Sequence, residues 1–307
     1  MKNWFENRET NPDHFRLERE AGQNILRFLP EPSFADARFL MRGPLMDGSN
    51  GDIAVLQERL ARVAGFPAAR VTGFPADPMG VSLPLIAPRQ VHGVEVIESA
   101  VGHALPSRPE ADGILLTSGD VEASLRFADC APVLILPSEE WARRNRPWAL
   151  LLHSGYRGTV QNIARAGLQR VAQVMGQGAV ASASAWVGPC IAGESYPRTW
   201  EAWTERGLAA FHPENVRRPL EDPPAGAEGR FYFDLAGELR AQLRECGLAP
   251  RNIFVSGLDT ASAAGCYSYR RGDKVDRMML LVRLAGRQGA TKRKDEGIIN
   301  AGSAVRG

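Results

Sequence analysis

Short apolar runs alternate along the chain with longer segments in which apolar residues recur at helical spacing. The runs predict strands, because stretches of four to eight apolar or alternating residues bounded by turn residues are typical of strands. These predicted strands cover residues 37–41, 89–97, 114–117, 123–127, 133–136, 148–152, 183–188, 231–233, 252–256 and 278–284. Several are continuously apolar, which is typical of a sheet covered on both faces.

Helices are predicted between these strands. The segment 53–63 has apolar residues at helical spacing after Asp52, a good N-cap, and before Gly65. The other predicted helices cover 160–175, 197–211 and, after the cap Asp234, the residues up to Cys246. Residues 137–147 are expected to be a charged connector. Interleaved strands and helices favour one α/β domain with mixed sheets.

Both ends of the chain are more polar than its middle. Residues 1–30 are expected to be a polar N-terminal extension, partly helical over 14–29. Residues 286–307 are polar and rich in glycine, which predicts a disordered tail. The catalytic domain is therefore expected over 31–285.

Charge and cysteine usage limit the classes of function. A net charge of +2 and dispersed arginines argue against nucleic-acid or membrane binding. No apolar run is long enough to span a membrane, and the N-terminus lacks the apolar core of a signal peptide. The four cysteines form no Cys-x-x-Cys pair, and we expect reduced thiols in a cytoplasmic protein.

Three potential metal ligands occur where predicted strands begin or end. Cys130 follows Asp129 between two apolar runs, His153 follows the apolar run 148–152, and His92 precedes a glycine. One thiolate and two imidazoles match zinc, or copper as a second choice, and three protein ligands leave one open position. Separations of 38 and 23 residues require a site assembled in three dimensions.

The pattern alone leaves a simpler interpretation open. A buried cysteine is more often a small apolar residue than a ligand. His103 and His212 lie in loop-like segments near prolines and are expected to be exposed.

Five short motifs occur in order along the chain and together resemble the laccase-domain, or multicopper polyphenol oxidase-like, family of the YfiH type, over roughly residues 35–285. The motifs are Gln90-Val91-His92-Gly93, Ala128-Asp129-Cys130-Ala131-Pro132-Val133, His153-Ser154-Gly155-Tyr156-Arg157-Gly158-Thr159, Gly188-Pro189-Cys190-Ile191 and Ser268-Tyr269-Arg270-Arg271. Two departures concern residues near the motifs. Tyr156 stands where the family usually has tryptophan, and Asp259-Thr260 stands where it has Cys-Thr.

The resemblance implies a fold, a metal and an activity. The fold would be an α/β/β/α sandwich with mixed sheets, and His92, Cys130 and His153 would hold zinc. The activity would be phosphorolysis of adenosine, inosine or methylthioadenosine to the free base and ribose 1-phosphate, with adenosine deamination as a further activity. The partners would then be a purine nucleoside and phosphate, and the chain a monomer or small homo-oligomer.

Roles for further residues follow as expectations. Arg42, Arg157, Arg270 and Arg271 are candidates for phosphate, because guanidinium groups pair with it bidentately, although each could instead be a surface or packing residue. Gln90 could bond a purine edge or only the backbone. Asp129 is counted with Cys130 and His153 as a catalytic residue; it would orient a ligand histidine or merely cap a turn.

Rival functions remain. Cys130 as nucleophile with His153 as base would make a hydrolase of amides, acting in peptidoglycan precursor editing. The chain could also be a copper-dependent polyphenol oxidase, although its five histidines are few for a multicopper centre. A nucleotide-binding protein with a structural metal is a fourth interpretation.

Overall fold

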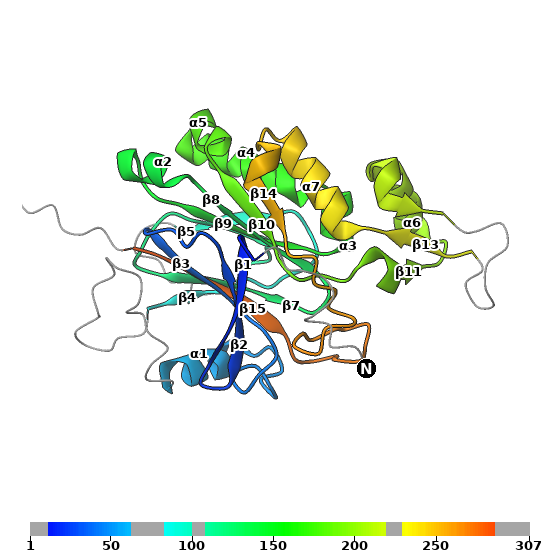
Figure 1. Cartoon of the computed structure of the whole chain (residues 1–307), viewed down its shortest axis with the longest axis horizontal. Helices are drawn as coiled ribbons and strands as arrows, with labels where there is room; N and C mark the ends of the chain where they lie inside the picture. Colours follow the sequence, from blue (N-terminus) through cyan, green and yellow to red (C-terminus); the bar gives the residue numbers. More distant parts are fainter. Residues whose placement is uncertain (1–11, 63–82, 100–107, 219–228, 286–307) are drawn as a thin grey trace, which may run out of the picture.

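The computed structural model describes residues 12–62, 83–99, 108–218 and 229–285. Within them two six-stranded sheets lie face to face, and a small three-stranded sheet projects beside them (Figure 1). The first sheet has the order β1 (Phe15–Glu20), β2 (Gln23–Phe28), β3 (Ala35–Leu40), β15 (Met278–Leu284), β7 (Glu122–Phe127), β4 (Leu85–Ile86). Only the β4–β7 pair in it is parallel.

The second sheet is also mixed. Its order is β14 (Ile253–Val255), β10 (Ser184–Val187), β8 (Ala131–Leu136), β9 (Ala149–Ser154), β6 (Gly113–Leu116), β5 (Val96–Ser99). The β10–β14 and β5–β6 pairs are parallel and the others antiparallel. The small sheet consists of β11 (Pro197–Arg198), β13 (Phe231–Phe233) and β12 (Val216–Arg217).

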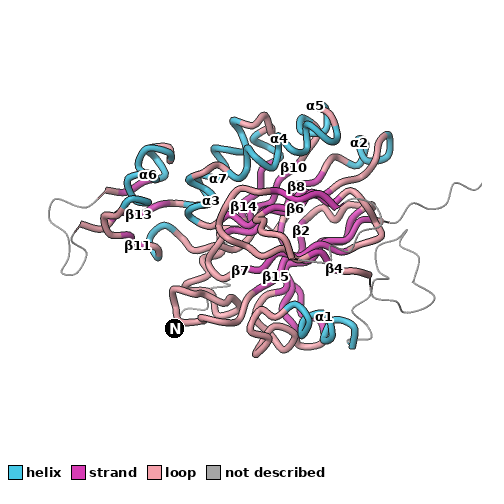
Figure 2. Tube along the Cα trace, turned by 180° about the vertical axis from the view of Figure 1, so that it is seen from behind, coloured by secondary structure: helices cyan, strands magenta, loops and turns pink. Residues whose placement is uncertain are grey.

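Helices cover the outer face of the second sheet, and α1 lies at the opposite side of the molecule (Figures 1 and 2). The helices are α1 (Ile53–Arg62), α2 (Glu139–Arg144), α3 (Tyr156–Val160), α4 (Ile163–Met175), α5 (Gln177–Ala181), α6 (Ala202–Ala210) and α7 (Leu235–Glu245). Single 3₁₀ turns occur at η2 (Gly193–Ser195), η3 (Pro213–Asn215) and η4 (Pro250–Asn252). The layers therefore confirm the expected α/β architecture with mixed sheets.

Strand β9 shows why the apolar runs are continuous. Successive side chains of a strand point to opposite faces. Leu151 packs in the core between the two sheets, whereas Leu150 and Leu152 pack in the core beneath the helices. Both faces of the second sheet are thus buried, as the sequence predicted. No helix among the described residues is long and apolar enough to cross a membrane.

The helix expected over residues 14–29 is wrong. This segment forms the antiparallel pair β1–β2, with Leu17 opposite Leu26. Arg27 explains the misleading polarity: it is buried and makes ion pairs with Glu18, Glu20 and Asp36. Part of the expected N-terminal extension is therefore integral to the first sheet.

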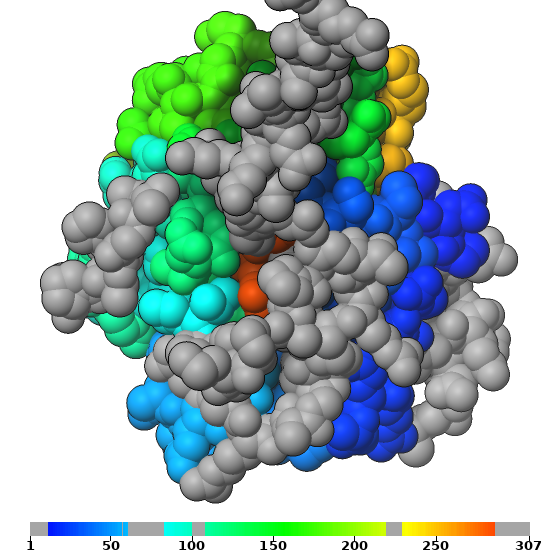
Figure 3. All heavy atoms as spheres, turned by 90° about the vertical axis from the view of Figure 1, so that its left-hand side faces the viewer, coloured from blue at the N-terminus to red at the C-terminus, as the bar shows by residue number. Residues whose placement is uncertain are grey.

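The paired strands at the two ends of the chain meet in this sheet. β15 lies between β3 and β7, and the orange-red atoms of β15 are visible between blue and cyan-green surfaces in Figure 3. The strand expected over 278–284 is confirmed. The tail expected over 286–307 lies outside the described residues.

Several predicted boundaries are wrong, including that of the strand expected over 89–97, of which only residues 96 and 97 lie in β5. Asp234 caps α7 and Asp52 caps α1 as expected, each accepting a bond from a backbone N–H. The helix expected over 197–211 begins only at Ala202, because Pro197 lies in strand β11. The helix expected from residue 160 begins at Ile163, since Asn162 has a left-handed φ of 60° and caps it. The expected connector 137–147 contains the short helix α2.

Candidate metal centre

His92, Cys130 and His153 come together at one edge of the second sheet. One potential ligand atom from each lies within 4.8 Å of the others. Strands β8 and β9 are neighbours, with Ala131 opposite Ser154. This register brings Cys130 near His153. His92 approaches from the loop before β5, and its ring centroid lies 4.9 Å from that of His153.

The backbone is unusual at two points beside this triad. His92 has a φ of 61° and Asp129 a φ of 81°, both in the left-handed region that residues other than glycine rarely adopt. Such conformations cost on the order of 1–3 kcal/mol each and persist only where surrounding contacts hold them. Hydrogen bonds hold both residues: Asp112 accepts the backbone N–H of His92, and the side chain of Asp129 accepts bonds from Thr260 and Arg270.

Asp112 holds the His92 loop. Its fully buried carboxylate accepts hydrogen bonds from the backbone N–H groups of Val91, His92 and Gly93, at 3.1, 3.0 and 2.7 Å. It also lies 2.7 Å from Nδ1 of His153. One carboxylate therefore positions two of the three potential ligands, and it leaves Nε2 of His153 for the site.

The site favours the thiolate form of Cys130. Burial raises the pKa of the thiol, but the charges of His153 and His92 and their hydrogen bonds outweigh burial and lower it to about 6. Burial lowers the pKa of His153, whereas Cys130 and Asp112 raise it to about 9. Burial would raise the pKa of Asp112, and its bonds with His153 and the backbone lower it overall. Thiolate is the form of cysteine that binds metals.

The residues present suit a metal ion. A Cβ atom at Gly155 would lie 2.7 Å from Sγ of Cys130 and 2.8 Å from Cδ2 of His92, so any larger residue would crowd the donor atoms. A sulfur donor and two imidazoles, oriented by a buried carboxylate, make a typical zinc ligand set with one position open.

The triad opens into a cavity of about 1050 Å³. In the described part of the chain, six basic side chains line it: Arg126, Arg157, Arg198, Arg270, Lys274 and Arg277. Asp129 is the one carboxylate among the described lining residues. Its two oxygens accept hydrogen bonds from Oγ1 of Thr260 at 2.7 Å and from the backbone N–H of Arg270 at 2.8 Å. The cavity is therefore strongly cationic.

The hydrogen bonds of Asp129 and Gln90 decide between the alternative roles expected for these two residues. Asp129 bonds Thr260 and Arg270, whereas Asp112, which the sequence did not single out, lies 2.7 Å from Nδ1 of the potential ligand His153. Asp129 instead ties the turn before Cys130 to the 268–271 segment. Gln90 bonds the backbone N–H and C=O of Arg126 at 2.9 and 2.8 Å, which agrees with the backbone interpretation.

The four predicted arginines separate into two pairs. Arg157 and Arg270 line the cavity, with their guanidinium groups 5.0 Å from the ring of Trp203 and 4.9 Å from that of Tyr196. Arg42 and Arg271 are not among the lining residues and both pair with the carboxylate of Asp273, at 2.7 and 3.4 Å. They fit the packing alternative.

The sequence did not indicate that four other basic residues line the cavity. Arg126 and Arg277 lie at or next to paired strands β7 and β15, Arg198 ends β11, and Lys274 is in a loop. No local motif marked them, because they converge from segments far apart in the sequence.

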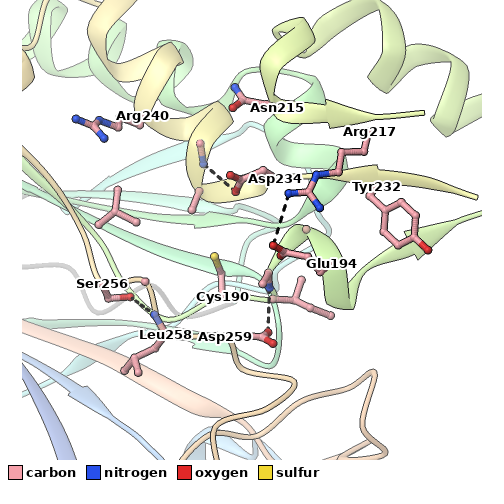
Figure 4. A pocket seen from close by; sticks show the side chains of 18 of the residues that line it. Cys190, Glu194, Asn215, Arg217, Tyr232, Asp234, Arg240, Ser256, Leu258 and Asp259 are labelled. Atoms are coloured by element: carbon pink, nitrogen blue, oxygen red, sulfur yellow. Dashed lines mark hydrogen bonds and ion pairs between the residues drawn. The ribbon is translucent and has the colours of Figure 1, made fainter. Parts of the chain in front are cut away.

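A second cavity of about 340 Å³ is shown in Figure 4. Ile191 lines both cavities. Cys190 is in its wall, and burial raises the pKa of that thiol, which keeps it protonated. Asp259 accepts bonds from the N–H of Ala192 and from Oγ of Ser195. Its carboxylate thus closes a turn, and Cys190 has a packing role.

Known proteins resemble this chain in sequence. The model of the family described as multi-copper polyphenol oxidoreductase laccase matches residues 75–285. The purine nucleoside phosphorylase YlmD of Bacillus subtilis is 30% identical over 173 residues, which are 56% of this chain and 58% of that protein. A purine nucleoside phosphorylase of Rickettsia conorii is 24% identical over 159 residues, covering 52% and 59%. The matches thus span less than two thirds of these relatives.

Solved structures share the fold. YfiH of Bacillus licheniformis has a TM-score of 0.67 at 20% identity, covering 89% of this chain and 99% of that protein. YlmD of Geobacillus stearothermophilus has a TM-score of 0.65 at 23% identity, with the same coverage. The mixed α/β fold of several sheets is therefore confirmed. Together with the family match over most of the chain, it shows that this protein belongs to the multi-copper polyphenol oxidoreductase laccase family of the YfiH type.

Proposed function

We propose that the chain is a zinc-dependent purine nucleoside phosphorylase, with adenosine deamination as a further activity. The observation that supports it most is the cavity at the potential metal site: the His-Cys-His group opens into a space that, counting only described residues, is lined by six basic side chains and one carboxylate. Phosphate is the anionic co-substrate that this charge favours. Relatives of low identity carry the name purine nucleoside phosphorylase.

His92, Cys130 and His153 would hold the metal, and Asp112 keeps the imidazole of His153 in the tautomer that presents Nε2. When bound, zinc supplies a Lewis acid with one open coordination position. Copper is the second choice. The three ligands come from separate segments, so Asp112 also keeps the site assembled before substrate enters.

Arg157 and Arg270 are the proposed phosphate ligands. Each lines the cavity, and neither makes an ion pair with a carboxylate among the described residues. The faces of Trp203 and Tyr196 hold them by cation–π contact without neutralising them. A guanidinium held in this way can bind two phosphate oxygens and orient the nucleophile toward the ribose.

The test combines metal analysis of the purified protein with inosine and adenosine assays, each with and without phosphate. We expect stoichiometric zinc and release of free base and ribose 1-phosphate only with phosphate. Arg157→Gln should raise the KM for phosphate more than that for inosine, whereas Arg251→Gln, on the exposed turn η4, should change neither. Metal-loaded protein that releases no base with phosphate contradicts the proposal; ammonia released from adenosine without phosphate supports deamination.

A second candidate rests on the Cys130–His153–Asp112 arrangement, which has the order of nucleophile, base and orienting carboxylate found in cysteine hydrolases. Such an enzyme would cleave an amide, as in peptidoglycan precursor editing. Its activity would survive metal removal and disappear in Cys130→Ala. Phosphorolysis would instead be lost on metal removal. Oxidation of a phenol by copper-loaded protein would favour the polyphenol oxidase alternative.

A further inference from the structure

Three of the cavity's basic residues form a group of their own. Arg126, Lys274 and Arg277 all line the cavity, and Gly51 links two of them. The carbonyl oxygen of Gly51 accepts a bond from Arg126 at 3.3 Å, and a Cβ at Gly51 would lie 3.4 Å from Cγ of Arg277. Nζ of Lys274 and the guanidinium of Arg277 both approach the ring of Tyr269, at 3.8 and 6.0 Å, so the three cations belong to one region of the wall, next to the 48–51 turn.

Neutral acceptors hold these side chains. Arg126 donates to the carbonyl of Pro88 at 3.0 Å and to the side-chain oxygen of Gln90 at 3.3 Å. Arg277 donates to the carbonyls of Asp276 and Lys274, at 2.8 and 2.9 Å, and Nζ of Lys274 donates to that of Tyr269 at 2.8 Å. Carbonyl oxygens orient a cation without cancelling its charge.

The neighbouring carboxylates, Asp273 and Asp276, bond other groups. Asp273 pairs with Arg42 and Arg271 and accepts from the N–H of Ser268. Asp276 accepts from the backbone N–H groups of Gly48 and Asn50, at 3.0 and 3.1 Å. Among the described residues, no carboxylate pairs with Arg126, Lys274 or Arg277.

Burial and neighbouring positive charges change the pKa of Arg126. Burial, followed by the like charges of Arg108 and Arg277, lowers the pKa of its guanidinium to about 10. It remains charged at neutral pH, and no carboxylate of the described segments serves as its counter-ion. A partly buried, unneutralised cation is costly unless an anion binds beside it.

We propose that Arg126, Lys274 and Arg277 form a second oxyanion subsite, which binds a phosphate group carried by the substrate. The preferred substrate would then be a purine nucleoside monophosphate rather than the bare nucleoside. This inference rests on the proposed function, because it defines the substrate class of the same cavity. Arg157 and Arg270 remain the ligands of the attacking phosphate.

Binding measured without turnover tests the subsite independently of the reaction. Isothermal titration of metal-loaded protein in phosphate-free buffer compares inosine with inosine 5′-monophosphate. We expect the monophosphate to bind about tenfold tighter or more, as charge-assisted hydrogen bonds contribute. Lys274→Gln, at an exposed position, should remove most of this preference, and Arg126→Gln should do the same while affinity for inosine persists. Arg240→Gln, on the exposed face of α7, is the matched control.

Equal affinity of the wild type for the two ligands overturns the subsite, as does a preference that survives both Lys274→Gln and Arg126→Gln. A rise in the KM for inorganic phosphate in these variants, with no monophosphate preference, assigns the group to free phosphate and also overturns it. A different result would show that the proposed function fails while the subsite holds. In that case inosine plus phosphate yields no base, whereas the protein still binds the monophosphate more tightly than inosine in the titration.

Discussion

Nδ1 of His153 lies 2.7 Å from a carboxylate oxygen of Asp112. His153 lies in β9, and Asp112 directly precedes the neighbouring strand β6. The same carboxylate accepts three backbone N–H groups around His92. Asp112 therefore joins the loop that carries one potential ligand to the strand that carries another. It explains how His92 keeps a left-handed backbone conformation without a glycine.

Asp112→Asn should weaken metal binding by about 10- to 100-fold while His92, Cys130 and His153 remain present. The amide cannot accept from His153 and the three N–H groups as a carboxylate does. Zinc affinity measured by competition with a chelator tests this. Asp120→Asn, which alters an exposed carboxylate bonded to Ser118, should bind zinc like the wild type. Unchanged affinity in Asp112→Asn would refute the orienting role.

Gly155→Ala should greatly reduce metal content, because the added Cβ would lie 2.7 Å from Sγ of Cys130. The crowding is expected to cost about 1–3 kcal/mol of stability. Gly178→Ala is the matched control, since a Cβ there meets nothing within 4 Å. Metal content and thermal unfolding should be measured for both variants; full zinc occupancy in Gly155→Ala would show that the site needs no such space.

Leu26→Ala should lower the free energy of unfolding by about 2–5 kcal/mol, because Leu26 is fully buried. Its partner across the β1–β2 pair, Leu17, is 43% exposed, and Leu17→Ala should cost much less. Denaturant titration of the two variants measures the difference. Equal, small losses would mean that β1 and β2 are dispensable for the fold.

His212 should make stability depend on pH. The sequence predicted an exposed residue, but its ring bonds the buried carboxylate of Glu238 and also Glu245. The bond to Glu238 raises the pKa of His212 above its ordinary value of 6.5, although burial opposes it. Its contribution, about 1 kcal/mol or less, is therefore fully present below pH 6.5 and lost as pH rises through the raised pKa. The stability difference between wild type and His212→Gln should shrink over that range; a difference that grows with pH would contradict this.

Local pattern predicted most strands of the second sheet and part of the first sheet. Of the strand expected over 89–97, only residues 96 and 97 lie in β5, and His92 lies in the loop before it. Continuous apolar runs such as 148–152 mark strands that are buried on both faces, and Cys130 and His153, which follow or precede such runs, lie close together. The β1–β2 segment was misread because its charges are neutralised by partners on neighbouring strands, which a linear pattern does not show.

From its residues alone, the chain indicates an α/β fold and three potential metal ligands, His92, Cys130 and His153, because apolar patterning and ligand chemistry are local properties. Which carboxylate orients the ligands, and which arginines face the cavity, depended on the folded chain. Asp112 and Asp129 look alike in sequence, and so do Arg42 and Arg270. Only strand pairing and loop packing decide which of them meets His153 or the cavity and which is paired with another residue, since burial and charge neutralisation arise between segments far apart in the sequence.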